Sequence, residues 1–198
     1  GFGLSVWLLT WARFTAPQLV VGALYTGRKG WAVWRTKAPW LQAARSTSLA
    51  TATLCLFGAV SQISLTTNVM IFYLNIFIVA ILAIPMLNER MTWLQWACSA
   101  AGFGGVVLAL GPQSLAEDLR WPLLLAFGAA TFAGLYTLFT RMAGKHDSIE
   151  TSQVYTTLSG ALLFFPFAMM NLPSEISWPL LAILCSFGLL GGIAHQFM

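Results

Sequence analysis

Long apolar runs dominate the chain and are separated by short polar connections. Runs of about the length of a transmembrane helix lie at 4–26, 41–64, 68–87, 92–111, 121–141, 151–171 and 178–198. About 20 mostly apolar residues are enough for a helix to cross the hydrocarbon of a bilayer. Helices satisfy their own backbone hydrogen bonds, which lipid cannot do, and the continuous runs lack the alternation of membrane-barrel strands. We therefore predict an all-α integral membrane protein with about seven transmembrane helices.

Basic residues are concentrated in alternate connections. On one side these residues are Arg28, Lys29, Arg35, Lys37, Arg90, Arg141 and Lys145, whereas the other side holds Arg120 alone. Because Lys and Arg accumulate in cytoplasmic loops, the basic side is predicted to be the cytoplasmic face of an inner membrane. Tryptophans occur where the two interfaces are expected: Trp31, Trp34, Trp40 and Trp93 inside, and Trp121 and Trp178 outside.

Local signals agree with the predicted helix starts. Thr92 and Gln95 have the spacing of a capping box, and Asp147 with Glu150 could cap the segment that begins at 151. Pro122 and Pro179 suit the first turns of their segments. Small residues recur every fourth position, which lets neighbouring helices approach closely; they are Ala97, Ala101 and Gly105, then Ala126, Ala130 and Gly134, then Gly188 and Gly192.

Composition excludes several classes of protein. Of 198 residues, 58% are hydrophobic and only 8% are charged, against about 25% charged residues in soluble domains. These values exclude an ordinary soluble enzyme, a disordered regulator and a nucleic-acid-binding domain. The net charge of +4 follows from the basic connections. Cys55, Cys98 and Cys185 are widely separated in apolar stretches, so neither a disulfide framework nor a metal site is indicated, and no cofactor is implied.

Residues 41–112 carry a pattern that resembles a known family of transporters. A helix opens with an arginine, a short link follows, and a long apolar helix ends in the turn Asn88-Glu89-Arg90 before a glycine-rich helix closes in Gly-Pro. This pattern is similar to the EamA-type repeat of the drug/metabolite transporter superfamily, where the first residue of the turn is usually Gly. A proline of the family's long helix is also replaced here, by the Asn75-Ile76 region. The stretch at 11–14 resembles the family's second helix, and 188–197 resembles the eighth helix of a subgroup that includes riboflavin and S-adenosylmethionine carriers.

The resemblance implies a bundle of ten helices built from two inverted five-helix repeats. Residues 1–112 would form the first repeat without its first helix, and 121–198 a second repeat without its last helices. The chain begins without an initiator Met and stops at Met198 in the middle of an apolar segment. We therefore expect it to be a piece of a longer protein.

Two arginines and one histidine are the ionisable groups expected at or near membrane depth. Arg13 lies well inside its segment, where it could anchor a substrate carboxylate or phosphate, or bond to neighbouring carbonyls. Arg45 is closer to the inner interface and is expected to snorkel toward water, with a place in the substrate pathway as the alternative. His195 could bind substrate or titrate during transport, or could be a hydrogen-bonded interior residue.

Uncharged polar residues complete the predicted substrate site. Asn75 and Tyr73 interrupt an apolar helix, and Gln62 and Tyr136 are weaker candidates of the same kind. Glu89 and Arg90 are expected to form a helix cap or a cytoplasmic gate. The absence of Asp and Glu at membrane depth favours an anionic or zwitterionic substrate over a cationic drug.

We therefore predict a secondary transporter that moves a small anionic or zwitterionic metabolite by alternating access. Its partners would be the substrate and the lipid bilayer, without nucleic acid; a coupling proton and a homodimer remain open. An intramembrane serine hydrolase using Ser159 and His195 is one alternative, and a seven-helix receptor is another.

Overall fold

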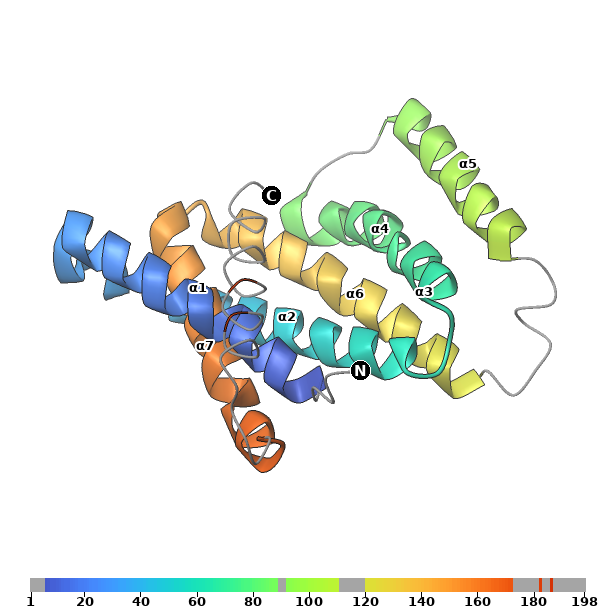
Figure 1. Cartoon of the computed structure of the whole chain (residues 1–198). Coiled ribbons are helices and arrows are strands. Elements are labelled where there is room, and N and C mark those ends of the chain that lie inside the picture. Colours follow the sequence, from blue (N-terminus) through green and yellow to red (C-terminus); the bar gives the residue numbers. More distant parts are fainter. Residues whose placement is uncertain (1–5, 89–91, 111–119, 173–181, 183–185, 187–198) are drawn as a thin grey trace. The chain divides into compact units, whose positions relative to one another are not determined.

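The computed structural model describes residues 6–88, 92–110, 120–172, 182 and 186 (Figure 1). All the regular elements in these ranges are helical. They are α1 (Val6–Lys29), a 3₁₀ turn η1 (Gly30–Trp34), α2 (Pro39–Val60), α3 (Leu65–Phe72), α4 (Asn75–Leu87), α5 (Trp93–Leu110), α6 (Arg120–Ala143) and α7 (Ile149–Met170). The predicted all-α class is therefore confirmed for this part of the chain.

Three stretches of the described residues are long and apolar enough to cross a membrane. They are Leu65–Leu87, Trp121–Ala143 and Ile149–Met170. The predicted segments at 4–26, 41–64 and 92–111 are helical as α1, α2 and α5, while most of 178–198 lies outside the described residues. The count of seven transmembrane helices and the inverted repeat stay predictions.

The predicted helix at 68–87 is interrupted. It starts earlier, at Leu65, and Tyr73 and Leu74 form a turn between α3 and α4. At this turn the amide of Leu74 donates to the carbonyl of Ile71 over 3.0 Å, an i to i+3 bond of the 3₁₀ type, and the amide of Phe77 does the same to Leu74 over 3.0 Å. The predicted apolar span is therefore confirmed as Leu65–Leu87, and what the sequence did not predict is the tightening of its hydrogen-bond ladder that separates α3 from α4.

The described chain forms two compact units. The first contains α1, η1, the beginning of α2 and α7, and the second contains the rest of α2 with α3 to α6. In the first unit α1 crosses α7 (Figure 1), and three aromatic pairs join these helices at ring-centroid distances of 5.0, 6.2 and 5.7 Å: Trp7–Phe167, Trp11–Phe165 and Phe14–Phe164. Residue numbers rise along one helix as they fall along the other, so the two helices are antiparallel.

The second unit has an apolar core around the small residues of α6. Ala126 and Ala130 are fully buried against Ala59, Ile71 and Leu74. Farther along the same stripe, a Cβ on Gly134 would come within 3.1 Å of Ile78 Cγ2. The close approach predicted for this stripe is confirmed.

The corresponding stripe on α5 behaves differently. Ala97, Ala101 and Gly105 are exposed in the described part of the chain, and a Cβ on Gly105 would meet nothing within 4 Å. The close packing predicted there is wrong for the described residues, because α5 contacts its unit through other side chains, Phe103 edge-on to Phe77 at 6.1 Å among them. The predicted capping box of α5 is confirmed: the amide of Thr92 donates to Gln95 Oε1 over 2.8 Å, and the amide of Gln95 donates to Thr92 Oγ1 over 3.4 Å.

Candidate functional site

Arg45 lies in the interior of the first unit, one turn and a half into α2. Its side chain is only 2% exposed, and its Nη2 donates to the carbonyl of Ser152 over 2.9 Å and to the hydroxyl of Thr156. Its Nη1 contacts the amide oxygen of Gln42 at 3.4 Å. The expectation that Arg45 snorkels to water is therefore wrong. The hydroxyl and backbone acceptors that α7 offers at this level hold the guanidinium inside, where it links α2 to α7.

Gln42 continues this network toward the helix ends. Its amide nitrogen donates to Ser152 Oγ over 3.0 Å and to Asp147 Oδ2 over 2.9 Å. Asp147 also accepts from the backbone amide of Lys37 over 2.8 Å and from the hydroxyl of Thr36. Partial burial opposes ionisation of Asp147, but the hydrogen bonds from Gln42, Thr36 and Lys37 outweigh it and lower the pKa of this carboxyl.

Asp147 does not cap α7, although the sequence suggested that it could. Ser148 is the cap, because its Oγ accepts from the amide of Thr151 over 3.3 Å. Glu150, in the first turn, instead forms an ion pair with Lys29 at the end of α1, with 2.6 Å between Oε1 and Nζ. The carboxylates at the start of α7 therefore attach this helix to α1 and to the connection before α2.

Arg13 contrasts with Arg45 in the same unit. It is the eighth residue of α1, is partly buried, and forms no hydrogen bond or ion pair with any residue that the structure describes. Two further polar atoms of α1 and α7, Thr15 Oγ1 and Gln153 Nε2, are buried without a hydrogen-bond partner. Because a buried polar group without a partner is costly, these three groups are candidates to bind a polar solute.

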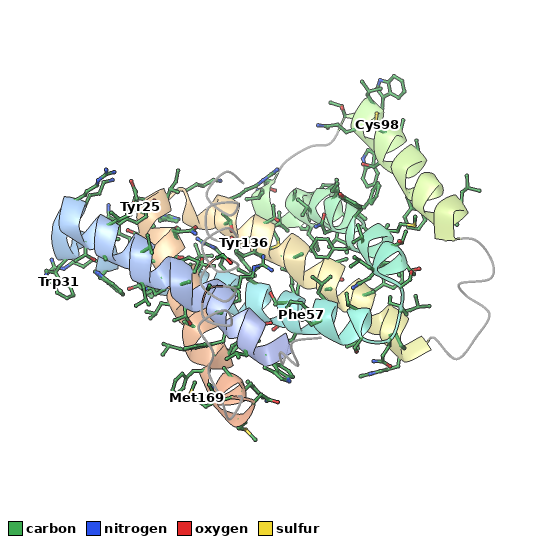
Figure 2. The ribbon with its side chains drawn as sticks, viewed as in Figure 1. Tyr25, Trp31, Phe57, Cys98, Tyr136 and Met169 are labelled. Atoms are coloured by element: carbon green, nitrogen blue, oxygen red, sulfur yellow. The ribbon has the colours of Figure 1, made fainter. Side chains whose placement is uncertain are left out.

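The uncharged site candidates lie in the second unit. Tyr73 is 58% exposed and lies in the turn between α3 and α4, and Asn75 is partly buried at the first position of α4. Gln62 is exposed and donates to the carbonyl of Gly58 over 3.3 Å. Tyr136 is partly buried on α6 (Figure 2). Their part in a substrate site stays a prediction, and Glu89, Arg90 and His195 lie outside the described residues.

Several interior polar residues were missed by the sequence analysis. Gln42 is 1% exposed in the Arg45 network, and Asn68 is fully buried, with its Nδ2 donating to the carbonyl of Leu56 over 3.1 Å. A usable signal was present for Gln42, since it precedes Arg45 by three residues and therefore shares a helix face with it. A second signal was the polar run at 151–159 in the middle of an apolar sequence.

Ser159 does not have the surroundings of a catalytic nucleophile. Its hydroxyl donates over 3.0 Å to the carbonyl of Thr156, one turn earlier in the same helix. An activated serine would instead donate to a base. The described residues also contain no group of three or more His, Cys, Asp or Glu side chains that could hold a metal ion.

Comparison with known proteins identifies the class to which this fold and site belong. The EamA-like transporter family matches residues 3–111, more than half of the chain, so the chain belongs to that family. This confirms the resemblance found in the sequence, and a membrane location agrees with the apolar helices. No solved structure shows a significant match to the chain.

Several relatives that match the chain are named as transporters of small metabolites. The chain is 33% identical over 84 residues to a riboflavin transporter of Vibrio cholerae, a match that covers 42% of this chain and 26% of that protein. It is 32% identical over 111 residues to an S-adenosylmethionine uptake transporter of Rickettsia prowazekii, covering 54% of this chain and 37% of that protein. A riboflavin transporter of Rhizobium johnstonii is 26% identical over 176 residues, covering 86% of this chain and 56% of that protein. The chain thus spans less than two thirds of each relative.

Proposed function

We propose that this chain is part of a secondary transporter that carries a small anionic or zwitterionic metabolite across an inner membrane. Membership of the family and the relatives named as riboflavin and S-adenosylmethionine transporters support carriage of a small molecule. Transport would proceed by alternating access, with the two predicted repeats rocking about the substrate. The basic connections would face the cytoplasm.

The proposed substrate class rests on the difference in hydrogen bonding between Arg45 and Arg13. Arg45 already donates to Ser152, Thr156 and Gln42, so its hydrogen bonds hold helices together. The guanidinium of Arg13 has no such partner among the described residues and lies near the middle of an apolar segment. An arginine in this position can bind a carboxylate or phosphate with two parallel hydrogen bonds. Arg13 is therefore proposed as the anchor for the negative group of the substrate.

The substrates named for the relatives allow this proposal to be tested with defined molecules. S-adenosylmethionine carries a carboxylate that an arginine can bind, whereas riboflavin has no such group. Uptake of both should be measured with the whole protein in membrane vesicles. If a carboxylate is recognised, Arg13→Gln should lower uptake of S-adenosylmethionine by about tenfold or more, the equivalent of the ~1.5–3 kcal/mol of a charged hydrogen bond. Arg13→Lys should retain part of the activity.

The control is the amount of correctly inserted protein. Arg13→Gln should insert as well as the parent, because this guanidinium forms no hydrogen bond or ion pair with a residue that the structure describes. Unchanged uptake in that variant would remove Arg13 from the site. Absence of uptake of any tested metabolite by the parent protein would instead count against the transporter itself.

A further inference from the structure

The segment between α1 and α2, residues 28–40, combines exposed basic and exposed aromatic side chains. Trp31 and Trp40 are 75% and 79% exposed, and Arg28, Arg35 and Lys37 are exposed as well. Figure 2 shows Trp31 at the end of α1, pointing away from the ribbon. None of the described residues pairs with the charged ends of Arg28, Arg35 and Lys37. The segment thus presents three available cations.

The backbone of this segment is fixed by contacts on its inner side. Val33 is 3% exposed, and the carbonyl of Trp34 accepts from the hydroxyl of Tyr155 over 2.8 Å. The indole nitrogen of Trp34 donates to Thr26 Oγ1 over 2.9 Å. Asp147 holds the segment at Thr36 and at the amide of Lys37, as described above. These anchors hold the backbone in place while the exposed side chains remain available for a partner, so little ordering of the backbone would accompany binding.

The position of the segment indicates the partner. Asp147 and Glu150 hold it at the start of Ile149–Met170, a helix long and apolar enough to cross a membrane. Indole rings at the end of such a helix favour the boundary between lipid and water. Lys and Arg at this level attract anionic lipid headgroups, and the attraction falls off within a Debye length of the surface. A phosphate group flanked by an indole matches both kinds of side chain. The carboxylates nearest the segment, Asp147 and Glu150, are already engaged by Thr36, Gln42 and Lys29.

We propose that residues 28–40 form a binding surface for the headgroup of an anionic phospholipid. Arg28, Arg35 and Lys37 would bind the phosphate, and Trp31 and Trp40 would lie at the level of the glycerol backbone. The surface is separate from Arg13 and does not depend on which metabolite is carried. Phosphatidylglycerol serves as the test lipid because it carries a single negative charge, and phosphatidylcholine has the same phosphate without net charge.

The first experiment measures the thermal unfolding midpoint of the whole protein in two kinds of vesicle. One contains equimolar phosphatidylglycerol and phosphatidylcholine, and the other contains phosphatidylcholine alone. The midpoint of the parent protein should be higher in the anionic vesicles, and the difference should shrink in molar salt. The triple variant Arg28→Gln, Arg35→Gln, Lys37→Gln should lose most of this shift. Its matched control, Arg28→Lys, Arg35→Lys, Lys37→Arg, preserves the charge and should keep the shift.

A second measurement decides the matter even if the glutamine variant fails to fold. Brominated phosphatidylglycerol quenches a nearby indole, so the parent protein should lose more fluorescence with that lipid than with brominated phosphatidylcholine. Most of the excess should disappear in the double variant Trp31→Phe, Trp40→Phe. Equal midpoints for the parent in both vesicles, or equal quenching by both lipids, would overturn the proposal. An equal rise of the midpoint with soluble glycerol phosphate would assign a site for free phosphate esters instead and would also overturn it.

Discussion

The ring of Phe14 lies directly against the backbone of Gly160, where α1 crosses α7. A Cβ built on Gly160 would overlap with Cδ1 and Cγ of that ring. The ring cannot easily withdraw, since it is buried and stacks on Phe164 at a centroid distance of 5.7 Å. The absence of a side chain at Gly160 is therefore what allows α1 and α7 to pack at this level.

Gly160→Ala is accordingly expected to destabilise the first unit by about 1–3 kcal/mol, the usual cost of overpacking. The measurement is the thermal unfolding midpoint of the purified protein in detergent. Adding Phe14→Leu should recover part of the loss, because the smaller side chain leaves room for the new methyl group. A Gly160→Ala protein as stable as the parent would contradict the contact.

Arg45→Met should lower stability, in contrast to Arg13→Gln. Removing the guanidinium deletes its hydrogen bonds to Ser152 and Thr156. The buried acceptors lose this donor, at an expected cost of about 1.5–3 kcal/mol in the free energy of unfolding. Thermal unfolding of the two variants, compared side by side, checks this assignment. If Arg45→Met unfolds at the parent's midpoint but no longer transports, Arg45 would be a substrate residue and the roles proposed for the two arginines would be reversed.

The Asp147 network predicts a loss of stability in acid. The hydrogen bonds from Gln42, Thr36 and Lys37 favour the ionised carboxyl, so its pKa is lower in the folded protein than in the unfolded chain, where 3.8 is the ordinary value. The resulting stabilisation is complete above the ordinary pKa of 3.8, and it is lost as the pH falls from there through the lower pKa of the folded protein. The midpoint should be followed from neutral pH to pH 3 or so in the parent and in Asp147→Asn. The difference in midpoint between the parent and Asp147→Asn should become smaller in acid. A difference that stays constant with pH would argue against the hydrogen bonds assigned to ionised Asp147.

Asn88 ends α4 in the left-handed conformation, with φ 54° and ψ 29°. Asn tolerates this conformation and Gly adopts it without strain, whereas a β-branched side chain does not. Asn88→Val should therefore cost about 1–2 kcal/mol, and Asn88→Gly should be at least as stable as the parent. The unfolding midpoints of the two variants test the left-handed conformation assigned to Asn88. Equal midpoints for the valine and glycine variants would contradict it.

The same residue shows what sequence reasoning can reach. The family resemblance places Gly at position 88, where this chain has Asn, and the left-handed backbone explains why Asn is an acceptable substitute. Helix types and most boundaries were predictable because apolar runs and capping residues are local signals, as Thr92 and Gln95 show. The interior position of Arg45 was not, because it depends on hydroxyl and carbonyl groups on α7 more than 100 positions away in the sequence. No local pattern separates an arginine that reaches water from one that finds such acceptors.

The exposed stripe of α5 and the interrupted span at Tyr73 escaped prediction for a related reason. Whether small residues are buried depends on which helix packs against them. Their spacing along the sequence does not contain that information. The break between α3 and α4 contains no Gly or Pro, the residues that usually mark such a point.

The turn at Tyr73 and Leu74 changes which residues of the span share a face. Here eight residues of α3 and thirteen residues of α4 are joined through a turn of the 3₁₀ type. Such a turn has about 3.0 residues where an α-helix has about 3.6. The residues of α4 are therefore rotated about the helix axis from where an uninterrupted α-helix starting at Leu65 would place them, so a plain α-helical count from α3 assigns the wrong face to α4.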